Sequence, residues 1–184
     1  MADEAAPIVA DTAIVEPGAS VGAGSRVWHH AHVRSGASVG SEVTVGEGAF
    51  VDAGVVVGDR SKIQNGAQLF APAVVDTGAF VGPGAILTND RNPRAVAPDG
   101  SPLGSAGWTA VGCRVGRGAS LGAASTIVCT EVGEWAMVAA GSVVVEPVVP
   151  HALVAGVPAR QIGWVCLCGT RQSETCPVCG WSIP

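Results

Sequence analysis

The sequence predicts an all-β fold, a parallel β-helix of hexapeptide repeats, and three observations support this prediction. Aliphatic side chains recur at every sixth position through the first half of the chain. A small residue, usually alanine or serine, stands four positions after most of them. Glycine is concentrated in the turn half of the repeats. The fourteen aliphatic positions are Val9, Val15, Val21, Val27, Val33, Val39, Val45, Val51, Val57, Ile63, Leu69, Val75, Val81 and Leu87.

A period of six matches neither an α-helix nor one long strand, but it suits short strands joined by tight corners. Each repeat aims one branched side chain at the axis, and the small residue leaves room at the corner. Three repeats close a coil of eighteen residues, and coils stack at a strand spacing of about 4.8 Å. Collagen would need glycine at every third residue, and disorder is excluded by a 48% apolar content with a strict period. A β-sandwich would need alternating patterns and irregular turns.

Composition narrows the classes of partner. The net charge of −5 and the pI near 5.2 argue against nucleic-acid binding. Nine of the ten cationic residues are arginine, whose planar fork suits phosphate and carboxylate groups. No charged-then-apolar leader opens the sequence, and no apolar run approaches the roughly 20 residues of a membrane span. We therefore expect a soluble cytoplasmic protein that meets small anionic molecules and binds no membrane.

The repeat divides the chain into three parts. Residues 1–8 form an N-terminal tail, residues 9–160 form the β-helix, and residues 161–184 form a cysteine-containing tail. The repeat is interrupted at residues 88–108, a polar segment rich in proline and glycine. A loop this long in a compact repeat is uncommon unless it is functional. The repeat then resumes near Thr109 and takes one irregular step of five from Ile127 to Val132. We expect Pro147, Pro150 and Pro158 to halt strand pairing, so that the following stretch passes along the outside of the coils or caps them.

The four cysteines of the tail predict a structural zinc site of the zinc-ribbon type. They lie in two short knuckles, and four thiolates complete the tetrahedral coordination of Zn²⁺. Because no open position remains, this zinc would not be catalytic. The ligands are Cys166, Cys168, Cys176 and Cys179. By contrast, we expect Cys113 and Cys129 to be small buried residues of the coils.

The loop and one early repeat carry the other candidate functional groups. Asn89, Asp90, Arg91 and Arg94 gather an amide, a carboxylate and two guanidinium groups in the loop, which favours a polar binding rim. The alternative is an Asx turn at the start of the loop with solvated arginines. His29, His30 and His32, in VWHHAHV, fall outside the inward slots and should face solvent or another subunit. A three-histidine metal site, as in β-helix carbonic anhydrases, would need a distant histidine pair that the coils lack.

Several segments together resemble the sugar N-acetyltransferases of the hexapeptide-repeat family. They are VWHHAHV, FVDAGVVVG, IQNGA, TNDRNPR, GASLGAASTIVC, GEWAMVAAGSVV, GVPARQIGW and the cysteine knuckles. The resemblance implies a left-handed helix, a homotrimer, and active sites in grooves between subunits. It also implies transfer of acetyl from acetyl-CoA to a nucleotide-linked amino sugar. The expected acceptor is UDP-2-acetamido-3-amino-2,3-dideoxyglucuronate, used for surface polysaccharide.

The resemblance also implies roles for individual residues. Asn89 would be catalytic and would orient the acceptor amine through its side-chain oxygen, with Arg91 or Arg94 pairing the uronate or the nucleotide phosphates. The substrate-binding set is His29, His30, His32, Asn65, Asp90, Arg91 and Arg94. The acetyl-CoA set is Arg114, Arg117 and Arg160 for the phosphates and Ala140 and Gly141 for the pantetheine arm.

Four alternatives remain at this stage. One of the histidines could be the general base, since imidazole titrates near neutrality. The acceptor could be a dTDP-linked amino sugar. The chain could be a carbonic-anhydrase-like enzyme, which would hold a second metal. It could also be a non-enzymatic trimeric scaffold whose zinc tip binds a partner protein. The segment LFAPAVV and the five-residue step depart from the family pattern and leave the fit of the acyl donor open.

Overall fold

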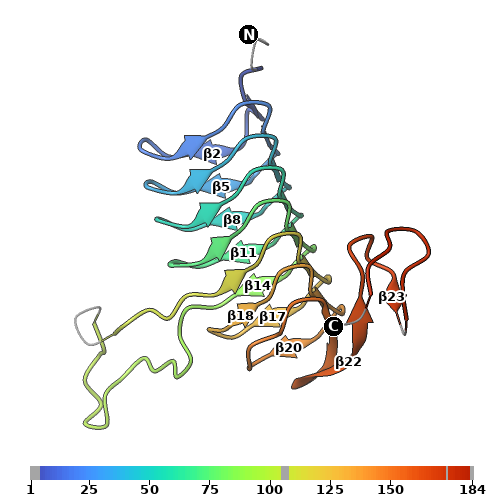
Figure 1. The fold of residues 1–184 in the computed structure, drawn as a ribbon. Helices are drawn as coiled ribbons and strands as arrows, with labels where there is room; N and C mark the ends of the chain where they lie inside the picture. Colours follow the sequence, from blue (N-terminus) through green and yellow to red (C-terminus); the bar gives the residue numbers. More distant parts are fainter. Residues whose placement is uncertain (1–4, 105–107, 173, 183–184) are drawn as a thin grey trace.

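The computed structural model describes residues 5–104, 108–172 and 174–182, and these residues form a parallel β-solenoid (Figure 1). The chain winds around three sheets, which we call A, B and C in the order in which the chain meets them. The corners between them are the AB, BC and CA edges. No helix occurs among the described residues, and hence none with the length and apolar character of a membrane span.

The strands of each sheet come from successive coils. Sheet A contains β1 (Ile8–Val9), β4 (Arg26–Val27), β7 (Thr44–Val45), β10 (Lys62–Ile63), β13 (Phe80–Val81), β16 (Ser120–Leu121), β19 (Met137–Val138), β21 (Ala152–Gly156), β22 (Ala159–Val165) and β23 (Arg171–Gln172). Sheet B contains β2 (Ile14–Val15), β5 (His32–Val33), β8 (Phe50–Val51), β11 (Gln68–Leu69), β14 (Ile86–Leu87), β17 (Thr126–Ile127) and β20 (Val143–Val144). Sheet C contains β3 (Ser20–Val21), β6 (Ser38–Val39), β9 (Val56–Val57), β12 (Val74–Val75), β15 (Arg114–Val115) and β18 (Glu131–Val132).

The core is a narrow column of side chains that stack one coil above another. Val9 pairs with Val27 and Val27 with Val45, so equivalent residues lie eighteen positions apart, as the repeat predicts. From Val27 onward the predicted aliphatic positions are buried, and the small positions between them are buried as well. Where the small residue is serine, its hydroxyl is satisfied: Ser25 donates to the Gly40 carbonyl at 2.8 Å and accepts from the Val43 amide at 2.9 Å. The prediction of an all-β solenoid is therefore confirmed.

Three departures from the eighteen-residue coil lie on the BC edge, and the last is a step of 16 from Val132 to Val148. Val75 pairs with Val115, so the coil that contains the long loop spans 40 residues. The loop leaves the stack after β14 and projects away from it (Figure 1). In the next coil Val115 pairs with Val132, a step of 17 that reflects the short turn before β18. Extra or missing residues at a corner leave the pairing of all three sheets intact.

The last coil does not end where the prolines predict. β21 still joins sheet A in parallel with β19, and β22 and β23 then extend the same sheet as antiparallel strands. β22 runs across residue 160, where we expected the β-helix to give way to the tail. At the other end, β1 begins at Ile8, within the predicted tail 1–8, of which residues 1–4 lie outside the described part of the chain.

The alternation of inward and outward side chains makes a direct prediction for neighbouring valines of β9. Val57 is 1% exposed and Val56 is 44% exposed. We expect Val57→Ala to lower the free energy of unfolding by about 2 kcal/mol, because two buried methyl groups are lost and a cavity remains. The matched control Val56→Ala should cost less than about 0.5 kcal/mol. Urea denaturation measures both, and equal losses would contradict the inward placement of Val57.

Candidate functional site

The AB edge carries a column of equivalent positions that changes character along the solenoid. The register of sheet A places one residue of each coil at the second position after its strand. In the first four coils this residue is polar, and in the later coils it is proline or alanine. The column is Asp11, His29, Glu47, Asn65, Pro83, Ala123 and Ala140. Three of the predicted site residues, His29, Asn65 and Ala140, therefore share one edge.

Three polar residues of this column, His29, Glu47 and Asn65, line an open pocket of ≈ 240 Å³ together with Trp28. The Nδ1 atom of His29 lies 2.8 Å from the Thr12 hydroxyl. The Glu47 amide donates to Oδ1 of Asn65 at 3.1 Å. This bond fixes the side-chain amide of Asn65 so that its NH₂ group is the free end.

The BC edge carries a charged and aromatic cluster at the start of the solenoid. His32 Nε2 lies 2.7 Å from Glu16, and Arg34 donates to Asp52 at 2.8 Å. The Ser35 amide, followed by His32, holds the pKa of Glu16 below its usual range. His32 also packs edge-on against Phe50, with ring centroids 5.6 Å apart. The three histidines thus separate: His29 and His30 lie on the AB edge, and His32 lies on the outer face of sheet B.

Asn89 lies further along the BC edge, where the long loop begins. Its Nδ2 atom donates to the Ala71 carbonyl at 2.8 Å, and the Ala71 amide donates to Oδ2 of Asp52 at 3.2 Å. Because the NH₂ end is held, Oδ1 is the free end, and no described residue donates a hydrogen bond to it. Burial raises the pKa of Asp52, but the Ala53 and Ala71 amides and Arg34 outweigh it and leave this pKa lowered. Asp52 thereby anchors Ala71 through the Ala71 amide, and the Ala71 carbonyl orients Asn89.

Of the loop residues after Asn89, some form hydrogen bonds that hold the loop in place and others are exposed to solvent. Asp90 accepts from the Asn92 amide at 2.8 Å, which is the Asx turn expected as the structural alternative. Arg91 donates to the Cys129 carbonyl at 2.9 Å and so ties the loop to the shortened corner of the next coil. Arg94 is exposed, and within the described part of the chain it donates only to the carbonyl of the preceding Pro93. Cys113 and Cys129 are buried, as predicted.

The residues assigned to acetyl-CoA do not gather in a single chain. Arg114 makes a bidentate ion pair with Asp76, at 2.7 and 3.0 Å, on sheet C. Arg117 lies on the CA edge, 3.3 Å from Glu134. Ala140 and Gly141 lie on the AB edge, and Arg160 lies in β22. Their roles remain predictions.

Sequence reasoning missed several residues that the structure places in these clusters. They are Glu16, Trp28, Glu47, Phe50, Asp52 and Phe70. The signal that finds them is a period of eighteen rather than six. When the sequence is aligned coil by coil, these polar and aromatic residues fall at the same positions as the predicted residues in neighbouring coils, or next to those positions.

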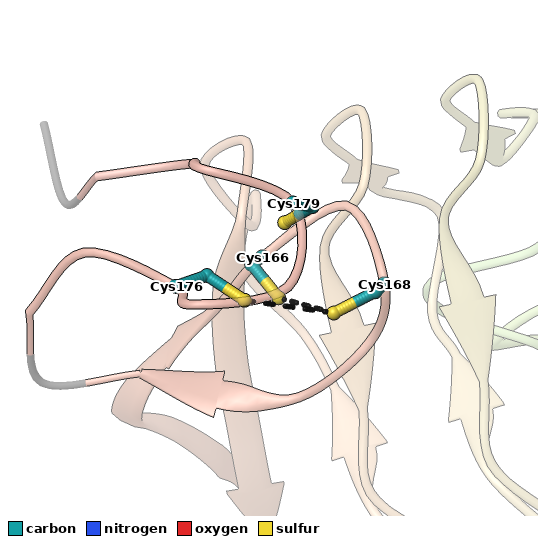
Figure 2. A group of neighbouring side chains, drawn as sticks. All are labelled: Cys166, Cys168, Cys176 and Cys179. Atoms are coloured by element: carbon teal, nitrogen blue, oxygen red, sulfur yellow. Dashed lines mark hydrogen bonds between the residues drawn. The ribbon is translucent and has the colours of Figure 1, made fainter.

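The four tail cysteines gather their sulfur atoms within 4.8 Å of one another (Figure 2). Cys168 Sγ lies 3.0 Å from Cys166 Sγ and 3.7 Å from Cys176 Sγ. Tetrahedral zinc at its usual bond length to thiolate would place sulfur atoms about 3.8 Å apart. Burial raises the pKa of Cys166, but hydrogen bonds from the Cys168 and Cys176 thiols outweigh it and lower this pKa to about 6. Among the described residues, this is the one group of three or more potential ligands with the spacing of a metal site.

The cysteine tail is held against the last coil. The ring of Trp181 stacks on His151 with centroids 4.4 Å apart, and His151 Nδ1 lies 3.0 Å from the Val165 carbonyl. The Gly169 and Gly180 amides close the two knuckles onto the Cys166 and Cys176 carbonyls, each at 2.9 Å. Four sulfur donors on two fixed turns fit a structural metal.

Comparison with known proteins gives matches to acetyltransferases. No protein-family model matches the chain. It is 50% identical to dTDP-3-amino-3,6-dideoxy-α-D-galactopyranose 3-N-acetyltransferase of Aneurinibacillus thermoaerophilus over 58 residues. These residues cover 31% of this chain and 30% of that protein. It is 39% identical to serine acetyltransferase of Escherichia coli K12 over 88 residues, and these residues cover 47% of this chain and 32% of that protein. The matches thus span about a third of each curated relative.

A solved structure shows the same fold. The acetyltransferase domain of PglB from Neisseria gonorrhoeae FA1090, in complex with acetyl coenzyme A, aligns with a TM-score of 0.54 at 22% identity. The alignment covers 86% of this chain and 58% of that one. The chain is therefore a hexapeptide-repeat β-solenoid similar to acetyl-CoA-dependent acetyltransferases. Within that class, the matched relatives include an amino-sugar N-acetyltransferase and a serine acetyltransferase.

The Asp52 contacts predict a pH-dependent stability. The folded-state pKa of Asp52 lies below the ordinary value of 3.8, so its stabilisation is present above that pH and is lost as the pH falls through the folded-state pKa. Asp52→Asn should lower Tm by roughly 2–4 °C at pH 7, for the loss of about 1 kcal/mol. The difference from the unsubstituted protein should shrink toward pH 3.

Thermal unfolding followed by circular dichroism between pH 7 and pH 3 measures this difference. The control is Glu42→Gln, which changes an exposed carboxylate on the CA edge. A Tm gap for Asp52→Asn that stays constant across the range would show that the charge of Asp52 is not the stabilising element.

Proposed function

We propose that the protein is an acetyl-CoA-dependent N-acetyltransferase that acts on the amino group of a nucleotide-linked amino sugar. The observation that carries the proposal is the fixed amide of Asn89, whose Nδ2 is held by Ala71 and whose Oδ1 is free. This amide lies at the base of the long loop. The amino-sugar acetyltransferase among the relatives supports the substrate class.

The chemistry needs an acceptor amine in its neutral form. The amine nitrogen forms a bond to the thioester carbonyl carbon, the C–S bond breaks, and CoA leaves as the thiolate. Asn89 Oδ1 accepts one N–H of the amine and so directs the nitrogen lone pair at the carbonyl carbon. A second proton of the amine leaves, directly or through water, and neutralises the thiolate.

A histidine base is the competing mechanism, and His32 is its best candidate because Glu16 lies 2.7 Å away. However, β5 is three strands from β14 in sheet B, which corresponds to roughly 14 Å at the usual strand spacing. His32 therefore lies too far from Asn89 in the same chain to share one reacting amine. We assign His29, His30 and His32 to substrate binding, and a histidine contributed by a neighbouring copy is the remaining form of the histidine-base alternative.

For the acceptor we propose UDP-2-acetamido-3-amino-2,3-dideoxyglucuronate, used for surface polysaccharide. A dTDP-linked 3-amino sugar is the second candidate, because the amino-sugar relative is named for such a substrate. Arg94 is available to pair a uronate or a phosphate, since it donates its hydrogen bond to a backbone carbonyl of its own loop. We propose that the pantetheine arm of acetyl-CoA follows the small residues of the AB edge at Ala140 and Gly141.

The assembly is also a proposal. We propose a left-handed winding, a homotrimer and active sites formed between neighbouring copies. The AB edge holds the polar pocket and the BC edge holds Asn89, and sheet B separates them in one chain. A groove between two copies would join these edges. We place the reaction in the cytoplasm, where unpaired thiols such as the six present here persist.

Substitution of Asn89 tests the mechanism. We expect Asn89→Ala to lower kcat/KM by roughly 100-fold or more, because a group that orients the reacting amine is lost. The matched control is Asn92→Ala, a change of the same kind in the same loop. The assay offers acetyl-CoA with a panel of UDP- and dTDP-linked amino sugars and follows thiol release. Unchanged turnover in Asn89→Ala, with loss of turnover on substitution of a histidine, would favour the histidine base.

Binding of acetyl-CoA separates an enzyme from a scaffold. An acetyltransferase should bind acetyl-CoA and show a higher Tm in its presence, by mass action on the folded state. A non-enzymatic scaffold should show neither effect. The absence of both effects would contradict the proposed function whatever the acceptor is.

We further propose that Cys166, Cys168, Cys176 and Cys179 hold a structural zinc ion. Elemental analysis of purified protein should find one zinc per chain, and Cys176→Ser should lose it together with a lower Tm, because binding free energy contributes to folding. Cys113→Ala is the matched control, since alanine is the usual residue in that buried slot. A second metal per chain would support the carbonic-anhydrase alternative, and zinc retained in full by Cys176→Ser would contradict the ligand assignment.

A further inference from the structure

We infer that the pocket lined by Trp28, His29, Glu47 and Asn65 binds the base of a uridine or thymidine nucleotide, an inference that rests on the proposed function. Its size limits what it accommodates. A cavity of ≈ 240 Å³ lies below the roughly 300–1,000 Å³ of sites that enclose a drug-sized ligand. The pocket therefore suits one ring of a larger molecule, with the rest of that molecule lying along the edge outside.

Trp28 supplies a flat surface beside the pocket. Its side chain is 46% exposed. Val27 pairs with Val45, so the residue after Val45, Gly46, occupies the same position one coil further on. Glycine at that position leaves the indole without a covering side chain on the pocket side. An exposed indole in a polar pocket is a stacking platform for a nucleobase.

The hydrogen-bonding groups select the kind of base. Asn65 Oδ1 is occupied by the Glu47 amide at 3.1 Å, so Asn65 presents its NH₂ group as a donor. The Glu47 carboxylate is exposed, and no described residue donates to it, so it presents an acceptor. Uracil and thymine carry an N3–H donor between two carbonyl acceptors, which matches this pair. Cytosine has the same size but carries an acceptor at N3, which a carboxylate would repel.

Charge excludes the other parts of the proposed substrate from this pocket. Glu47 lines it, and Asp11 lies 3.4 Å from the His29 ring on its border. Two carboxylates disfavour a phosphate or a uronate at close range. The base would thus sit at the polar end of the AB edge, and the phosphates and sugar would extend away from it. The later positions of the same column, Pro83, Ala123 and Ala140, leave that end of the edge clear for the acyl donor.

Titration of the 184-residue chain with nucleoside monophosphates tests the inference. The probes are UMP, dTMP and CMP, and calorimetry or ligand-observed NMR gives the affinities. UMP and dTMP should bind at least about tenfold more tightly than CMP, since the Glu47 carboxylate facing the N3 acceptor of cytosine loses a hydrogen bond and repels it.

Two substitutions assign the effect to the pocket. Trp28→Ala should weaken UMP binding by about tenfold or more, while Trp28→Phe should largely retain it because a stacking face remains. Glu47→Gln should bring the affinities for UMP and CMP within about threefold of each other, because an amide accepts or donates. Circular dichroism confirms that each variant is folded, and Glu47→Gln tests the inference even where Trp28→Ala does not fold.

Equal binding of UMP and CMP to the unsubstituted protein would overturn the inference, as would no UMP binding or an unchanged UMP affinity in Trp28→Ala. Acetyl-CoA binding and thiol release, measured on the same preparations, separate this failure from failure of the proposed function. Acetyl transfer without discrimination between UMP and CMP would contradict the assignment of the pocket to uracil or thymine and leave the proposed function standing. Absence of both acetyl-CoA binding and acetyl transfer would contradict the proposed function.

Discussion

The eighteen-residue coil is the constraint on which the rest of the structure depends. Each coil rests on the backbone of the coil before it, so a side chain has fixed neighbours eighteen positions away on either side. The contact between coils leaves little tolerance at the corners. A Cβ atom on Gly58 would lie 2.5 Å from the amide nitrogen of Thr77, and one on Gly22 would lie equally close to the carbonyl carbon of Gly40. The inward side chains therefore serve only to pack the core. Side chains that bind ligands or react must lie on the outer faces of the sheets or on the edges.

The same constraint explains why the irregular segments share one edge. A long insertion within a face would break the pairing of that sheet, whereas an insertion at a corner lengthens one coil and leaves every strand in register. Leu87 still pairs with Ile127 across the loop, and Val81 still pairs with Leu121. The corner of the following coil is one residue shorter, and its Cys129 carbonyl receives Arg91 from the loop. The base of the loop, where Asn89 lies, is therefore as firmly placed as a strand residue.

The sequence predicted those features that repeat or that depend on local spacing. The buried slots, the interruption after Leu87, the cysteine knuckles and the outward direction of the histidines all follow from the six-residue period or from short motifs. Contacts between side chains of different coils do not follow from the six-residue period. The period of six cannot tell that Trp28, Glu47 and Asn65 line one pocket, or that Asp52 supports Ala71 and through it Asn89, because these contacts connect whole coils. The added strand β21 was missed because the prolines around it interrupt the pattern without preventing one more parallel pairing with β19.

Charge pairing decides which of the predicted arginines remain available to an anionic ligand. Arg114 is held by Asp76 at 2.7 Å, and Arg117 lies 3.3 Å from Glu134. A phosphate would have to compete with a carboxylate already in place at each of these sites. Arg94 and Arg160 donate only to backbone carbonyls of adjacent residues among the described part of the chain, and so keep their charge uncompensated. In a protein with a net charge of −5, these two guanidinium groups are the stronger candidates for phosphate contacts, one in the loop and one beyond the last coil.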